Sequence, residues 1–269
     1  MINDILTQHF LQNAILVSIF ASILCGIVGT FVVVKKISYI SGGIAHSVLG
    51  GIGVAYFFNV QPIWGAFAAA IFSAIIIGIV SLKSRQHEDT VISALWAIGM
   101  AVGIIFMHKT PGYNTDLITY LFGNILMVSS SDITITIVLT AIVIFVVFLF
   151  YKQFLFISFD QQFAWIRGIN VTFIYILLLI LISITVVVLV RMVGLILVIA
   201  LLSLPGAISS LFTKKIFNMM IFSVALGIFF TSGGIMLSYQ PNLPAGATII
   251  LLSGVSYIVA LIIKRFISR

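Results

Sequence analysis

Long uninterrupted runs of apolar residues, separated by short polar segments, dominate the chain. A helix rises about 1.5 Å per residue, so about 20 apolar residues are enough to cross a hydrocarbon core of roughly 30 Å. The runs lack the alternation of apolar and polar residues that marks a membrane β-barrel strand. The pattern therefore predicts an all-α, polytopic membrane helix bundle of eight or nine transmembrane helices. The predicted spans are Gln12–Val34, Tyr39–Phe58, Pro62–Leu82, Val91–Met107, Ile133–Tyr151, Val171–Val190, Met192–Phe212, Ile216–Ser238 and Ala247–Ile263.

The composition supports a membrane protein. Of the 269 residues, 62% are hydrophobic and only 7% are charged, a balance foreign to soluble domains. All six acidic residues fall outside the predicted spans. Every loop is short, so we expect residues 1–269 to form a single transmembrane domain. The single cysteine excludes a disulfide framework within the chain.

The basic residues predict the orientation in the membrane. With the N-terminus outside and the C-terminus in the cytoplasm, only Lys109 and Arg191 lie on the outer side. The inner side then receives Lys35, Lys36, Lys83, Arg85, Lys152, Arg167, Lys214, Lys215, Lys264, Arg265 and Arg269. This asymmetry follows the positive-inside rule, so the net charge of +7 reflects topology and not nucleic-acid binding.

The second predicted span, Tyr39–Phe58, contains one ionisable residue, His46, among small residues. At helical spacing, Gly43, Ser47 and Gly51 form one ridge. The adjacent ridge consists of Gly42, His46, Gly50 and Gly53. Small faces let a second helix backbone approach closely, so this span is predicted to pack tightly.

An imidazole at membrane depth is costly unless it meets a polar partner, a cavity or an ion. Two interpretations of His46 stay open: a buried, hydrogen-bonded histidine, or a metal ligand in a transport path. One imidazole cannot complete a metal site alone. Ser47, water, backbone carbonyls or the His46 of a second copy would have to contribute further ligands.

Two further segments carry structural signals. Pro205 lies inside the span Met192–Phe212, where a missing backbone donor predicts a broken or kinked helix. In the inner segment Ile157–Asn170, Asp160 is expected to cap a short helix and Gly168 to terminate it. The residues by themselves are compatible with two roles for this short helix. It could dock a soluble partner, or it could lie against lipid at the membrane surface.

The chain lacks the sequence motifs of the common hydrolases. It contains no G-x-x-x-x-G-K-[ST] nucleotide loop, no H-E-x-x-H and no G-x-S-x-G. An enzyme is therefore not expected, no permanently bound cofactor is predicted, and the energy for transport would come from another polypeptide.

Several motifs in order along the chain resemble the permease subunits of zinc/manganese-type ABC importers. They are SGGIAHSVLGGIGVAYF at Ser41–Phe57, EDTVISALWAIGMAVGIIF at Glu88–Phe106, PGYNTDLITYLFGNIL at Pro111–Leu126, FDQQFAWIRGINV at Phe159–Val171, VGLILVIALLSLPGA at Val193–Ala207 and LPAGATIILLSG at Leu243–Gly254. The resemblance covers essentially the whole length. It implies a type II-like importer fold in the cell membrane (inner or plasma).

The resemblance implies partners and site residues. A homodimer would form the path, two cytoplasmic ATPase subunits would drive it, and an extracytoplasmic metal-binding protein would deliver the ion. The stretch 158–170 would be the coupling helix that contacts the ATPase. Within it, Asp160 and Arg167 would anchor the contact, Phe163 would supply apolar surface and Gly168 a tight turn.

In the same resemblance, His46 matches the pore histidine of the family. Many members carry an aspartate four residues earlier, where this chain has Gly42. Losing that carboxylate favours zinc as the transported ion over manganese or iron. Phe57 and Phe58, with the outer segment Pro111–Asp132, are expected to form an outer gate.

Three other functions remain as alternatives. The first is an ABC permease for a metal chelate. The second is a stand-alone channel or secondary carrier, and the third is a membrane protein of structure or assembly.

Overall fold

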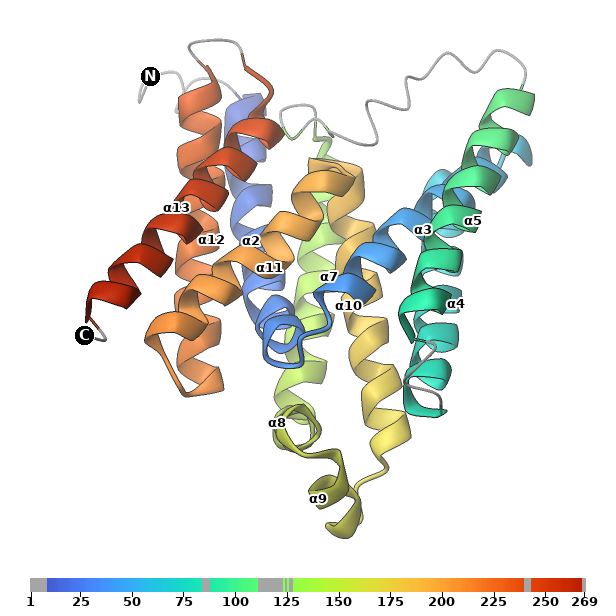
Figure 1. Cartoon of the computed structure of the whole chain (residues 1–269). Helices are drawn as coiled ribbons and strands as arrows, with labels where there is room; N and C mark the ends of the chain where they lie inside the picture. Colours follow the sequence, from blue (N-terminus) through green and yellow to red (C-terminus); the bar gives the residue numbers. More distant parts are fainter. Residues whose placement is uncertain are drawn as a thin grey trace. The chain divides into compact units, whose positions relative to one another are not determined.

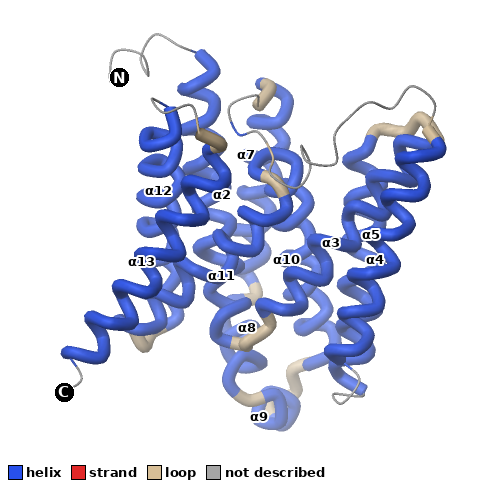
Figure 2. The backbone as a smooth tube through the Cα atoms, turned by 45° about the horizontal axis from the view of Figure 1, so that its top comes forward, coloured by secondary structure: helices blue, strands red, loops and turns tan. Residues whose placement is uncertain are grey.

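The computed structural model describes residues 9–83, 88–110, 123, 125, 128–239 and 243–267. Within these residues the secondary structure is helical, and Figure 2 shows the helices in blue with the described loops in tan. The helices are α2 (His9–Val34), α3 (Ser38–Phe57), α4 (Pro62–Lys83), α5 (Glu88–Lys109), α7 (Ser130–Leu149), α8 (Tyr151–Phe159), α9 (Gln161–Ile166), α10 (Val171–Val193), α11 (Leu195–Phe212), α12 (Ile216–Tyr239) and α13 (Ala245–Ile267).

The predicted membrane spans are confirmed. Nine helices of the described part are long and apolar enough to cross a bilayer. The short helices α8 and α9 are the exceptions, and α8 was not predicted. The outer segment between α5 and α7 lies largely outside the described residues.

The described chain divides into two compact units. The first contains α2, most of α7, the end of α10, and α11 to α13, and the second contains α3 to α5, α8, α9 and most of α10 (Figure 1). Among the described residues the boundaries fall at the end of α2, near the end of α7 and within α10, so only the last lies inside continuous helix.

In the first unit, α2 packs against α11 and α12 through small residues. A side chain at Gly26 would come within 2.6 Å of the Val224 backbone nitrogen, so the α2 and α12 backbones are nearly in contact. The buried hydroxyl of Ser22 lies 3.2 Å from that of Thr231 across the same interface. Close backbones with hydroxyl pairs are typical of helix packing in membranes.

Of the two outcomes predicted for Pro205, a broken or a kinked helix, the break is wrong. Helix α11 passes through this proline without interruption, and its side chain is buried. The next residue, Gly206, lies against α2, where an added Cβ would be 3.2 Å from the Gly29 carbonyl oxygen. We attribute the continuous helix to this packing, which offsets the one hydrogen bond that proline removes.

The interruption occurs instead at Gly194, between α10 and α11. Gly194 has φ +78°, a conformation that favours glycine, and it is the only residue between the two helices. Helix α10 extends to Val193, so the backbone of Arg191, predicted in an outer loop, is helical.

Candidate functional site

Helix α3 is one of the most buried helices of the second unit. Of its glycines, Gly42, Gly43, Gly50 and Gly53 are buried. A Cβ at Gly50 would lie 2.8 Å from the Gly99 carbonyl oxygen on α5, and one at Gly53 would lie 2.5 Å from that of Gly103. The predicted tight packing is therefore confirmed, and its main partner is α5.

The other small face of α3 packs against α4. A Cβ at Gly51 would overlap the Gly65 carbonyl oxygen of α4. A Cβ at Gly65 would likewise overlap the Gly51 carbonyl oxygen. On the same side, the Ser73 hydroxyl of α4 donates to the Ser47 hydroxyl at 2.8 Å. Ser47 in turn donates to the Ile44 carbonyl oxygen at 2.8 Å, so its hydrogen-bonding capacity is used within the unit.

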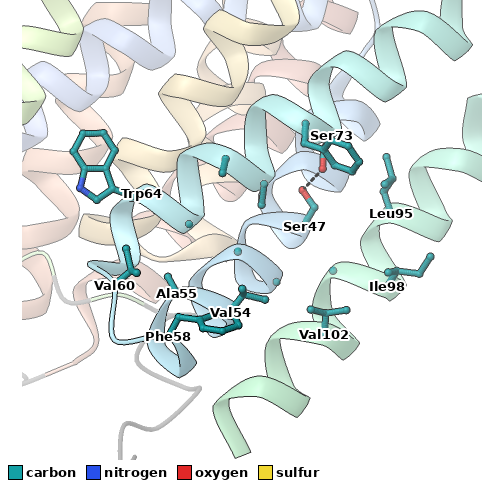
Figure 3. A pocket seen from close by; sticks show the side chains of 17 residues that line it. Ser47, Val54, Ala55, Phe58, Val60, Trp64, Ser73, Leu95, Ile98 and Val102 are labelled. Atoms are coloured by element: carbon teal, nitrogen blue, oxygen red, sulfur yellow. Dashed lines mark hydrogen bonds between the residues drawn. The ribbon is translucent and has the colours of Figure 1, made fainter. Parts of the chain in front are cut away.

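A groove of about 600 Å³ opens between α3, α4 and α5 (Figure 3). Ser47 and Ser73 supply hydroxyls to its wall, and the other lining side chains are apolar, Phe58, Trp64 and Leu95 among them. None of the lining residues is a histidine, cysteine or carboxylate, so this groove offers no titratable ligand to a cation.

His46 lies on a different side of α3 from the groove. Its ring stacks on Trp96 of α5, with centroids 4.0 Å apart and planes 10° from parallel. Nδ1 is buried and has no hydrogen-bond partner among the described residues, although the side chain as a whole is only half-buried. The side chains of His46 and Ser47 are thus adjacent in sequence but have different partners, Trp96 of α5 and Ser73 of α4.

No three His, Cys, Asp or Glu side chains of the described residues come together. Among the described residues, His46 therefore belongs to no ready-made cluster of metal ligands. A cation at this position would need ligands from a second copy, from water or from backbone carbonyls.

At the end of α3 that leads to α4, Phe57 and Phe58 lie in an aromatic cluster. The two rings meet edge to face at 5.3 Å, and Phe57 meets Phe106 of α5 at the same centroid distance. The outer segment expected to join them as a gate falls largely outside the described residues, so the gate stays a prediction.

The predicted short helix in the inner segment is confirmed as α9. The Asp160 carboxylate accepts from the backbone N–H groups of Gln162 and Phe163, at 2.8 and 3.0 Å. At the other end, Gly168 has φ +76° and donates to the Trp165 carbonyl oxygen, while Ile169 donates to that of Ala164. This pair of bonds is the Schellman motif, so both ends of α9 are capped within its own segment.

Helix α9 exposes large apolar side chains. Trp165 and Ile166 are 74% and 75% exposed, and Phe163 is also exposed. The Arg167 guanidinium lies 5.1 Å from the centroid of the Phe163 ring. The four residues predicted for coupling thus lie on or next to α9. Asp160 and Gly168 cap its two ends, and Phe163 and Arg167 form an exposed cation–π pair.

Lys35 connects this region to the start of α3, a contact that sequence analysis missed. Its amine donates to the Ile157 carbonyl oxygen of α8 at 2.8 Å and lies 4.9 Å from the centre of the Tyr175 ring. The Tyr175 hydroxyl lies 3.1 Å from that of Ser81 on α4. Lys35 therefore ties the end of α8 to the chain just before the His46 helix.

Trp96 is the other residue that sequence analysis missed. The motif around it was recognised, but one sequence contains no signal that pairs a tryptophan of α5 with a histidine of α3. Only the packing of the two helices brings the rings together.

Comparisons with known proteins agree with this architecture. The model of a family described as the ABC 3 transport family matches residues 7–264. An uncharacterized membrane protein of Synechocystis is 42% identical, over 97% of this chain and 92% of its own length. The manganese transport system membrane protein MntC of Listeria monocytogenes is 35% identical, over 96% of this chain and 92% of its own length. Among solved structures, PsaBC from Streptococcus pneumoniae in complex with Fab matches with a TM-score of 0.87 and 31% identity, covering 96% of this chain and 93% of the matched chain.

Proposed function

The chain belongs to the ABC 3 transport family, and from this premise we propose that it is the membrane permease of an ATP-driven importer of divalent transition-metal ions. The observation that carries the proposal is His46, a metal-capable side chain held inside a membrane-spanning helix with its Nδ1 unpartnered. The name of the Listeria relative supports a metal as the transported species.

The transport path is proposed to form between two copies of the chain. Among the described residues His46 belongs to no group of three or more His, Cys, Asp or Glu side chains, so a homodimer would supply a second imidazole. An extracytoplasmic metal-binding protein would deliver the ion to this path. The metal is the substrate and is not retained.

Energy would enter through α9. Its capped ends make it a rigid element, and its exposed Trp165, Ile166 and Phe163 offer apolar surface to a cytoplasmic ATPase. Closure of two ATPase subunits on ATP would displace α9 and α8. Lys35 would pass that displacement to the start of α3, and the path beside His46 would alternate between outer and inner access.

Zinc and manganese are the two candidate substrates. An imidazole site without a carboxylate favours zinc, because manganese prefers oxygen ligands. The name of the Listeria protein favours manganese. The two ions must therefore be measured side by side.

The test is uptake of radioactive zinc and manganese by vesicles that contain the chain with its ATPase partner. We expect ATP-dependent uptake of at least one ion, and little uptake when the ATPase carries an inactivating substitution. Zinc uptake that exceeds manganese uptake at equal concentration would support the carboxylate-free site as the basis of selectivity. Uptake that continues after ATP depletion and follows a proton gradient would contradict the proposal.

Replacement of Asp160 tests the role of α9. Asp160→Ala removes the oxygen that accepts the two first-turn N–H groups, at a cost of about 1 kcal/mol. A six-residue helix is not stable by intrinsic propensity alone, so losing this capping energy should unfold a large share of α9. We expect about fivefold less ATPase to co-purify with the chain.

Asp160→Asn is the matched control for this experiment. Asparagine keeps a capping oxygen at the same position, so it should retain most of the bound ATPase. Equal loss in both variants would show that the carboxylate charge acts directly and that the cap is not the cause. No loss in either would remove α9 from the docking surface.

A further inference from the structure

The buried nitrogen of His46 raises the question of what holds the imidazole in place. A metal-binding histidine normally donates its second ring N–H to a carboxylate, a carbonyl or a water, and this hydrogen bond fixes the ring. Nδ1 of His46 has no such partner among the described residues, and it is buried. The residue is partly exposed and Nε2 is not among the buried atoms without a partner, so we take Nε2 as the nitrogen that would meet an ion.

The stack on Trp96 supplies the missing constraint. The two rings are nearly parallel and their centroids are 4.0 Å apart, so the indole covers one face of the imidazole. A metal–nitrogen bond lies in the plane of the imidazole, along the nitrogen lone pair. The stack therefore fixes the orientation of the ring and leaves the direction of metal approach open.

Trp96 is itself held by its neighbours. Its indole N–H donates to the Met100 sulfur at 3.2 Å, one turn further along α5. The Tyr39 ring lies 6.4 Å from the Trp96 ring, and the Tyr39 hydroxyl pairs with that of Ser93 on α5 at 2.5 Å.

The backbone contact between Gly50 and Gly99 lies one helical turn beyond this cluster and fixes the separation of α3 and α5. This contact holds the α5 backbone at Trp96 close to α3, and the Met100 and Tyr39 contacts lie against the indole itself. The position of the imidazole is thus set by the packing of α3 on α5.

We propose that Trp96 is a positioning residue for metal transport, which orients His46 by ring stacking in place of a second hydrogen bond. This inference rests on the proposed function, because it gives Trp96 a role only if His46 meets the ion. It predicts that metal affinity depends on the presence of an aromatic ring at position 96. The size of that ring and the indole hydrogen bond to Met100 should affect the affinity less.

Two substitutions separate positioning from folding. In Trp96→Leu the stack is lost, and we expect the metal concentration for half-maximal uptake to rise about tenfold, the range seen for loss of groups that orient metal ligands. In Trp96→Phe a flat ring remains, and the increase should stay within about threefold. Phe148→Leu, on an 83% exposed side chain of α7, is the control for loss of an aromatic ring from a membrane helix.

Tryptophan fluorescence can report on the contact between Trp96 and His46. The chain has three tryptophans, so Trp64→Phe with Trp165→Phe leaves Trp96 as the only indole. In the full chain, reconstituted in lipid nanodiscs, addition of zinc or manganese should change the Trp96 emission until it saturates. The same background with His46→Ala should show no saturable change.

The outcomes distinguish this inference from the proposed function. If His46→Ala abolishes uptake while Trp96→Leu leaves the half-maximal concentration unchanged, Trp96 has no positioning role and the proposed function stands. If His46→Ala transports metal normally, the ion does not depend on this imidazole, so the inference about Trp96 fails while metal import itself stands. The proposed function fails only if the parent chain shows no ATP-dependent uptake of either ion. If Trp96→Leu does not reach the membrane, the emission of the single-tryptophan chain decides, and an emission that does not respond to metal overturns the inference.

Discussion

Replacement of His46 by alanine is expected to abolish metal uptake while the chain still reaches the membrane. Loss of a group that only orients a metal ligand already lowers affinity by about 10- to 100-fold, so loss of the ligand itself should lower the initial rate by at least about 100-fold. The fold should tolerate the change, because Nδ1 of His46 has no hydrogen-bond partner among the described residues that would be left unpaired. The measurement is the initial rate of zinc and manganese uptake, normalised to the amount of chain in the membrane.

Two companion variants sharpen this test. His46→Gln keeps a polar side chain of similar length but removes the imidazole, and it should be as inactive as the alanine variant. His108→Ala, on the exposed last turn of α5, removes a histidine far along the helix from the stack and should transport normally. Normal transport by His46→Ala would show that the ion takes a route without this side chain.

Introduction of a valine at Gly99 is expected to prevent α3 and α5 from packing. A Cβ at this position would lie 2.6 Å from the Ser47 Cα, and the contacted atom is backbone, which cannot rotate away. Overpacking of a core costs about 1–3 kcal/mol when side chains can adjust, so here we expect the upper end of that range or more. That is a large share of the few kcal/mol that keep a protein folded.

The effect of Gly99→Val would be measured as the yield of monodisperse chain after detergent extraction and as its thermal unfolding temperature. Gly254→Val is the matched control, because Gly254 also lies within a membrane-spanning helix, α13, but has no atom within 4 Å of an added Cβ. We expect the control to behave like the parent chain. Similar losses in both variants would show that helix propensity alone, and not the α3–α5 contact, causes the defect.

The helix contacts at Gly99 and the ring stack at Trp96 belong to the same interface. The small residues bring the α3 and α5 backbones together, and that approach places the indole against the imidazole. We therefore expect substitutions at the glycines to change metal affinity as well as folding, since both depend on the distance between the two helices.

The sequence by itself determined the elements of this protein. The bilayer fixes how long an apolar segment must be, so the nine spans could be predicted within a few residues of the observed helices. The ends of α9 could also be predicted, because Asp160 and Gly168 cap it through bonds to backbone only two to five residues apart in the chain. The small face of α3 was evident from helical spacing alone.

Only the tertiary structure decided how these elements meet. Proline suggested a break at Pro205, but packing against α2 keeps α11 continuous and the interruption falls at Gly194. Neighbouring positions on one helix can face different partners, so Ser47 pairs with Ser73 of α4 while His46 stacks on Trp96 of α5. Which helices pack together depends on the complementarity of two surfaces distant in the chain, and no local pattern of residues contains that information.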